Sequence, residues 1–181
     1  MGHYGDGAYG WDVVNEAITD DCGAEDPLKS SVWYPAVPDY VDVAFREARS
    51  AAPAGVKLFY NDYNVASSAG WSKCKSDKLY SMAKSMIARG VPIDGVGLQM
   101  HVRDGWGPDW VAGVQANMER LGALGLEVHV TELDVSCNSS IGCDWGPEAE
   151  KQQASLYASL LKACLAVKAC KNFETWGFTD K

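Results

Sequence analysis

The chain lacks several features that would assign it to common classes of protein. No apolar run approaches the roughly 20 residues that a membrane-spanning helix requires. Basic residues are few, with 16 lysines and arginines against 24 aspartates and glutamates, and the net charge is −8. Nucleic acids and anionic lipids are bound by clustered basic side chains, so this balance argues against both as partners.

Internal repeats, low-complexity tracts and linkers are also absent. The 181 residues, 47% hydrophobic and 22% charged, are typical of one globular domain with a sizeable core. The opening residues Met1–Gly7 carry neither the basic nor the apolar region of a secretory signal peptide. No glycine-rich phosphate loop follows a strand-like run, which argues against nucleotide binding.

The cysteines favour disulfides over a metal site. None of the six forms a CxxC pair and the three histidines are scattered, so we expect neither a metal nor a cofactor. Close spacing suggests Cys137–Cys143 and Cys164–Cys170, which leaves Cys22–Cys74, although other pairings and free thiols stay open. Asn138-Ser139-Ser140 is a glycosylation sequon, and with the cysteines it indicates a secreted, extracellular protein.

Strand-like and helical segments alternate along the chain. The strand-like runs are short and apolar, near residues 9–14, 56–60, 95–98, 127–131 and 173–178. Helical stretches lie between them, near residues 40–51, 77–89, 110–124 and 148–167. This alternation predicts an α/β fold with a parallel sheet and right-handed crossovers. An open doubly wound sheet and part of a (β/α)8 barrel both fit the pattern.

Polar and aromatic residues follow every strand-like run at its carboxyl end. They are Asn15 and Glu16, then Asn61, Asp62, Tyr63 and Asn64, then Gln99 and His101, then Glu132 and Asp134, and finally Trp176, Thr179 and Asp180. Because the carboxyl ends of parallel strands meet at one edge, these residues should share one rim.

Two of these residues are glutamates on separate strands, the minimum equipment for breaking a glycosidic bond. Hydrolysis of an acetal needs a proton for the leaving oxygen and an anion that faces the anomeric carbon. Glu16 is the candidate acid and Glu132 the candidate nucleophile. The two carboxyl groups of a retaining enzyme lie about 5–5.5 Å apart, and a gap near 9 Å would indicate inversion.

Neighbouring residues offer support for these two carboxylates. His101 is placed to form a hydrogen bond with Glu132 and to be oriented by Asp134. Asn15 and Gln99 are placed to hold a sugar or a carboxylate. Trp176 is placed to stack on a sugar ring. Each has a plainer interpretation, since a single Glu after a strand is usually solvated or a helix cap. His101 and Trp176 would then be structural, Asp134 a cap, and Asn61, Asp62 and Asn64 turn residues. The tryptophans in loops are weaker candidates: Trp33, Trp71, Trp106 and Trp145.

Five motifs, in the same order, resemble those of glycoside hydrolase family 10, the endo-1,4-β-xylanases. They are WDVVNEAI at 11–18, LFYNDYN at 58–64, GVPIDGVGLQMHV at 90–102, VTELDV at 130–135 and WGFTDK at 176–181. The resemblance implies a (β/α)8 TIM barrel, a retaining mechanism, xylan and xylo-oligosaccharides as substrates, no cofactor, and a monomeric complete domain.

The resemblance also implies roles for single residues. Glu16 matches the acid/base and Glu132 the nucleophile, with His101 and Gln99 beside the nucleophile and Asp134 orienting the histidine. Substrate contacts are implied for Asn15, Gln99 and Trp176, and Asn61 and Tyr63 are further candidates. Cys164–Cys170 resembles a disulfide of fungal members, which suggests a eukaryotic origin.

The chain departs from the family in its extent. The first motif matches the end of the fourth barrel strand, so residues 1–181 are expected to be a partial catalytic domain truncated to about strands 4–8, without the first three βα units or the final helix. We expect the isolated chain to be unstable and nearly inactive, because closing the barrel removes its sheet edges. A sharp thermal transition with release of reducing sugar from xylan would contradict this expectation. Two alternatives stay open: a related retaining enzyme acting on cellulose or mixed glucan, and an inactive xylan-binding fragment.

Overall fold

The structure is a computed structural model that describes residues 4, 7–103, 107–137 and 143–177. Three sequence features discussed above lie outside the described residues: the sequon at Asn138, Trp106, and the pair Thr179 and Asp180.

The described strands form one sheet in which all pairings are parallel. In chain order they are β1 (Gly10–Asn15), β2 (Lys57–Asp62), β3 (Gly95–Leu98), β4 (His101–Arg103), β5 (Glu127–Ser136) and β6 (Cys170–Thr175). The spatial order is β1-β2-β3-β5, and β6 pairs with the other edge of β5. The short β4 continues beyond β3 and pairs with the last residues of β5. The parallel α/β sheet predicted from the sequence is confirmed.

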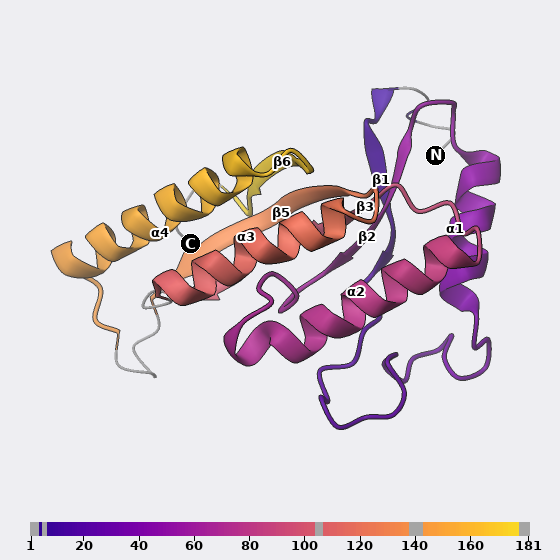
Figure 1. The fold of residues 1–181 in the computed structure, drawn as a ribbon, viewed down its shortest axis with the longest axis horizontal. Coiled ribbons are helices and arrows are strands. Elements are labelled where there is room, and N and C mark those ends of the chain that lie inside the picture. Colours follow the sequence, from indigo (N-terminus) through magenta and orange to yellow (C-terminus); the bar gives the residue numbers. More distant parts are fainter. Residues whose placement is uncertain (1–3, 5–6, 104–106, 138–142, 178–181) are drawn as a thin grey trace.

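Helices cover the sheet between successive strands (Figure 1). They are α1 (Tyr40–Ala51), the short 3-10 helix η2 (Gly70–Ser72), α2 (Lys73–Ala88), α3 (Pro108–Gly122) and α4 (Pro147–Ala166). Helix α1 packs on β1 and β2, α3 on β5, and α4 on β5, β6 and α3. Within the described part of the chain, no helix is both long and apolar enough to cross a membrane.

The core lies between the helices and the sheet. Each long helix contributes fully buried side chains, namely Phe45 from α1, Leu79 and Met86 from α2, Met118 and Leu121 from α3, and Leu160 from α4. They meet buried strand residues such as Leu58, Val96 and Val130. On helix α2, Leu79, Ala83 and Met86 are buried, whereas Ile87 is exposed.

Three predicted boundaries differ from the structure. The last strand, expected near residues 173–178, is β6 at Cys170–Thr175, so Trp176 follows it. The other two differ because of contacts between distant segments. Helix α2 begins at Lys73, so Asp77 lies in its second turn and pairs with Lys73 and Arg120 instead of marking the helix start. Strand β5 extends to Ser136 because β4, which the sequence did not predict, supplies backbone partners for its last residues. Gly90 and Gly125 follow their helices with positive φ, as expected for helix stops.

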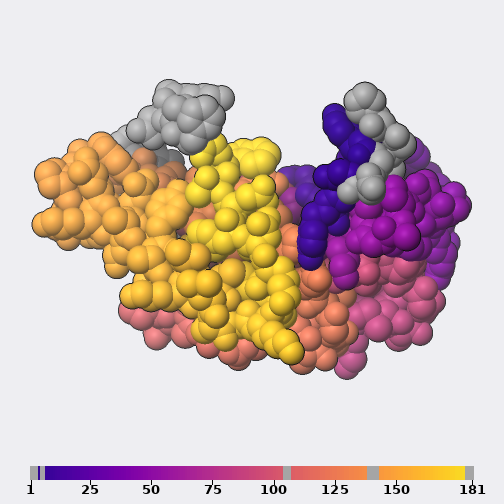
Figure 2. Space-filling model, turned by 90° about the horizontal axis from the view of Figure 1, so that it is seen from above, coloured from indigo at the N-terminus to yellow at the C-terminus, as the bar shows by residue number. Residues whose placement is uncertain are grey.

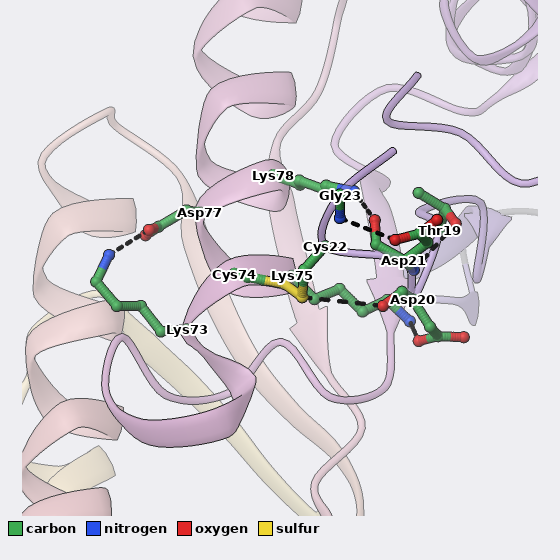
Figure 3. The surroundings of a disulfide bond; sticks show 10 residues. All are labelled: Thr19, Asp20, Asp21, Cys22, Gly23, Lys73, Cys74, Lys75, Asp77 and Lys78. Carbon is green, nitrogen blue, oxygen red and sulfur yellow. Dashed lines mark hydrogen bonds and ion pairs between the residues drawn. A yellow bond between two sulfur atoms is a disulfide. The ribbon is translucent and has the colours of Figure 1, made fainter. Parts of the chain in front are cut away.

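The three disulfides are those suggested by the cysteine spacing, Cys22–Cys74, Cys137–Cys143 and Cys164–Cys170. Cys22–Cys74 differs from the others, because it joins the loop after β1 to helix α2 across 52 residues, whereas the other two span six residues each. Figure 3 shows this link beside the ion pair between Lys75 and Asp20.

Removal of the long-range disulfide should cost more stability than removal of a short one. A cross-link stabilises by restricting the unfolded chain, by about 4 kcal/mol for a loop of this length and about 2 kcal/mol for the short loops. Urea unfolding of Cys22→Ala/Cys74→Ala and of Cys164→Ala/Cys170→Ala would measure both. Equal losses, or a larger loss for the short loop, would contradict this ranking.

Candidate active site

A continuous row of side-chain amides connects Glu16 with Glu132. Gln99 donates from Nε2 to Oε1 of Glu16 at 2.9 Å and to Oδ1 of Asn15 at 3.2 Å. Asn61 donates from Nδ2 to the same Asn15 oxygen at 3.1 Å and to Oε1 of Glu132 at 2.9 Å. The structure therefore brings these five side chains, each from the rim expected from the sequence, into one hydrogen-bonded set.

Strand register produces this alignment. Parallel pairing places Asn15 opposite Asn61 on β1 and β2. Just beyond the regular ladder, the backbone N–H of Glu16 donates to the carbonyl of Asn61 at 2.9 Å, and that of Glu132 to the carbonyl of Gln99 at 3.1 Å. The ends of four strands are thereby held level, with their polar side chains adjacent.

Glycine in β3 leaves the space that the Asn61 side chain occupies. A Cβ atom at Gly97 would lie 2.2 Å from Oδ1 of Asn61 and 3.0 Å from Cγ2 of Thr131. Thr131 in turn donates its hydroxyl to that same Asn61 oxygen at 2.8 Å. Sequence reasoning missed both Gly97 and Thr131; a glycine inside a strand is the signal that could have indicated a close approach.

His101 lies between two carboxylates. Its Nε2 is 3.2 Å from Oε2 of Glu132, and its Nδ1 is 3.0 Å from Oδ2 of Asp134. Register on β4 and β5 pairs His101 with Asp134 directly. A neutral imidazole donates to one of these carboxylates and a protonated one donates to both. Asp134 thus contacts the histidine and does not cap a helix.

The structure does not support the plainer interpretations of Trp176 as a structural residue and of Asn61 as a turn residue. Trp176 follows β6 and is 62% exposed, and its ring forms a T-shaped pair with that of His101, with 6.3 Å between ring centroids. It is therefore a surface aromatic at the rim and not core filling. Asn61 is a buried residue of β2 and not a turn residue, whereas Asn64, with φ 59°, lies in a bend of the following loop.

Tyr63 contacts charged side chains other than the two glutamates. Its hydroxyl accepts a hydrogen bond from Lys29 at 2.9 Å and donates one to Asp20. The ammonium of Lys75 lies 3.4 Å from its ring centroid. The structure therefore places Tyr63 in a cluster with Lys29, Asp20 and Lys75, and its described hydrogen bonds do not include the amide row.

A hollow lies beside the site, between β1 and β6 (Figure 2). Its volume is about 650 Å³, and its lining includes Asp12, Glu132, Glu174 and Trp176. Asp12 is solvent-accessible but set within this concave face. Partial desolvation there, followed by the charges of Glu132 and Glu174, raises the pKa of Asp12.

Three non-glycine residues just beyond strand ends have left-handed backbone conformations. They are Glu16 with φ 58°, Asn64 with φ 59° and Met100 with φ 60°. Such conformations are unfavourable for residues with a Cβ and persist where surrounding contacts enforce them. Here they redirect the chain at the rim, so the direction of the Glu16 side chain depends on the contacts of its backbone.

Gly97→Ala should disrupt the amide row. The added methyl group must displace Asn61 from Glu132, and overpacking of this kind costs about 1–3 kcal/mol. Gly107→Ala is the matched control, because no atom lies within 4 Å of the added Cβ. Chemical unfolding of both variants measures the difference, and equal stability would contradict this role of Gly97.

Asp12→Asn should stabilise the fold at neutral pH only. Because the folded-state pKa of Asp12 is raised, the ionised carboxylate weakens the fold once the pH rises through that value. Below the unfolded pKa of about 4 the group is protonated in both states, and the substitution should have no effect. Thermal unfolding at pH 7 and pH 3 compares the two. An equal shift at both values would contradict the charge explanation.

Comparison with known proteins identifies relatives over the whole chain. The model of glycosyl hydrolase family 10 matches residues 1–181. Endo-1,4-beta-xylanase B of Neocallimastix patriciarum is 40% identical over 171 residues, which cover 94% of this chain and 18% of that protein. Endo-1,4-beta-xylanase B of Thermotoga neapolitana is 37% identical, over 94% of this chain and 46% of that protein.

Solved structures agree with these relatives. Xylanase 10B from Thermotoga petrophila, in complex with xylobiose, superposes with a TM-score of 0.84 at 34% identity, covering 98% of this chain and 50% of that one. A glycosylated endo-beta-1,4-xylanase from Gloeophyllum trabeum gives 0.81 at 38% identity, covering 98% and 52%. The chain spans about half the length of these solved relatives. It belongs to glycosyl hydrolase family 10, and its parallel sheet matches about half of a (β/α)8 barrel of that family.

Proposed function

We propose that this chain carries the catalytic carboxylates of a retaining endo-1,4-β-xylanase. The observation that supports this most directly is the row of amides joining Glu16 to Glu132, with His101 and Asp134 on the far side of Glu132. Two carboxylates held by fixed donors at one rim are the equipment that double displacement at an acetal requires.

In the proposed reaction Glu16 is the acid and then the base. It protonates the oxygen that leaves as the glycosidic bond breaks, while Glu132 attacks the anomeric carbon and forms a glycosyl-enzyme. Glu16 then takes a proton from water as that water displaces Glu132. The expected carboxyl separation of about 5–5.5 Å stays a prediction.

The neighbouring residues have supporting roles in this proposal. His101 and Asn61 hold the two oxygens of Glu132 and so fix the direction of attack. Asn15 and Gln99 are proposed to hold sugar hydroxyls in addition to the carboxylates. The exposed face of Trp176 is proposed to pack on a sugar ring at the edge of the hollow. Tyr63 is retained as a weaker candidate for substrate contact.

The proposed substrate is xylan, with xylo-oligosaccharides as products. Relatives named endo-1,4-beta-xylanase support this choice, and the Thermotoga petrophila structure holds xylobiose. A related β-glycanase acting on cellulose is the second candidate, because a relative named Exoglucanase XynX, from Acetivibrio thermocellus, is 38% identical. Comparing hydrolysis of xylan with that of carboxymethyl cellulose separates the two.

Secretion is proposed from the three disulfides, because such bonds persist in oxidising compartments. The net charge of −8 supports a neutral polysaccharide as partner and argues against nucleic acid or an anionic membrane. A monomer is proposed for the complete domain.

Glu132→Ala should abolish hydrolysis of xylan by an active protein that contains this chain. Removing a covalent nucleophile costs about 10³-fold or more in kcat. Glu174→Ala is the matched control, since Glu174 lines the same hollow but lies outside the amide row. Reducing-sugar release measures both. Near wild-type activity of Glu132→Ala would show that Glu132 is not the nucleophile. Xylan binding without hydrolysis by the unsubstituted protein would favour the alternative of an inactive xylan-binding fragment.

A further inference from the structure

The backbone that carries Glu16 is held by a buried cluster at the end of β2. The amides of Ala17 and Ile18 donate to the Tyr60 hydroxyl at 2.9 and 3.0 Å. The Ile18 amide also donates to Oδ2 of Asp62 at 3.3 Å. With the bond from the Glu16 amide to the Asn61 carbonyl, three successive amides after β1 are bound by β2.

Tyr60 and Asp62 form one unit that water does not reach. Both side chains are fully buried, and the Tyr60 hydroxyl donates to Oδ2 of Asp62 at 2.5 Å. Burial, together with the charge of Asp62, raises the pKa of Tyr60 well above its ordinary value, so the phenol keeps its proton and remains a donor. Its two lone pairs face the amides of Ala17 and Ile18.

Lys75 of α2 balances the buried charge. Its ammonium lies 2.9 Å from Oδ1 of Asp62 and 2.8 Å from Oδ1 of Asp20, and its side chain is 4% exposed. Burial raises the pKa of Asp62, and Lys75 opposes that shift as the nearest positive charge. A buried carboxylate without this partner would be strongly unfavourable.

The outer end of the same loop is tied to α2 as well (Figure 3). The disulfide from Cys22 to Cys74 immediately precedes Lys75 in the helix, and Lys78 donates to the backbone carbonyl of Asp21. The loop from Glu16 to Cys22 is therefore fixed at its start by β2 and at its end by α2.

We propose that Tyr60 and Asp62 are positioning residues for Glu16, and that they enforce its left-handed backbone so that its carboxylate stays against Gln99. This inference rests on the proposed role of Glu16 as acid/base. Neither Tyr60 nor Asp62 contacts the carboxylate of Glu16 or of Glu132. Both would act on Glu16 through the backbone amides of Ala17 and Ile18. The plainer interpretation, that Asp62 is a turn residue, does not explain its full burial or its contacts.

Tyr60→Phe removes the Tyr60 hydroxyl and keeps its ring. Tyr80→Phe is the matched control, because Tyr80 lies on α2 and its ring faces Arg120. The first readout is hydrogen exchange of single amides, measured in a protein that contains this chain, and it needs no catalytic assay. In Tyr60→Phe the amides of Ala17 and Ile18 should exchange about tenfold faster, while those of α3 and α4 stay unchanged. Unchanged exchange at both amides would overturn the proposal.

The second readout separates positioning from general stability. In an active protein that contains this chain, Tyr60→Phe should lower kcat/KM for xylan by about 10- to 100-fold. It should leave kcat/KM for a dinitrophenyl xylobioside within about threefold, because that leaving group departs without protonation by an acid. Equal losses on both substrates would show a merely structural role and overturn the proposal.

Two further variants keep the outcomes distinct. If Tyr60→Phe does not fold, Asp62→Asn is used in its place. We expect the same faster exchange of the two amides and the same selective loss on xylan. Unchanged exchange, or equal losses on both substrates, would overturn the proposal. Glu16→Ala tests the proposed function separately. If that variant still hydrolyses xylan, Glu16 is not the acid/base, whereas the exchange result for Ala17 and Ile18 still reports on the backbone contact.

Discussion

The hydrogen bonds among Asn15, Asn61 and Gln99 are the interaction on which the candidate site depends, and they exist because β1, β2 and β3 are parallel and level. A shift of one residue in either pairing would turn these side chains to the opposite face of the sheet. The carboxylates of Glu16 and Glu132 would then lose the donors that hold them. The candidate site therefore depends on the fold, because packing of the core fixes the strand register and the register fixes the distances between the polar side chains of the site.

The parts of the fold that follow local patterns were predictable. The helices and long strands appear close to their expected ranges, because apolar spacing, helix-stopping glycines and strand length are all local properties. Strand β4 was not predictable, since His101–Arg103 is a strand only because the end of β5 lies beside it. The early start of α2 at Lys73 is a similar case, supported by ion pairs that involve the distant Arg120.

The candidate site shows the same division. Polar residues at strand ends were sufficient to select Asn15, Glu16, Gln99, His101 and Glu132. Their partners were less accessible to sequence reasoning, because side-chain direction depends on backbone turns that no composition reveals. Tyr63 stays a prediction for substrate contact, and the contacts that its side chain makes with Lys29, Asp20 and Lys75 could not be read from the sequence.

The structural roles of two other residues are apparent only in the folded chain. Asp62 was expected either among the polar residues of the rim or in a turn, and instead it is buried beneath the backbone of the Glu16 loop. Gly97 matters through the atom it lacks, since its missing side chain is the space for Asn61. Both cases depend on contacts between segments far apart in sequence.

In the proposed reaction, Glu132 forms a covalent bond with the sugar while Glu16 transfers the proton. Trapping the intermediate tests it most directly. An active protein that contains this chain would be incubated with a 2-deoxy-2-fluoro-xylobioside bearing a good leaving group, digested, and examined by mass spectrometry. We expect a fluoroxylobiosyl group on the peptide that contains Glu132, attached to that carboxylate. A label on Glu16, or product of inverted anomeric configuration with no label at all, would contradict it.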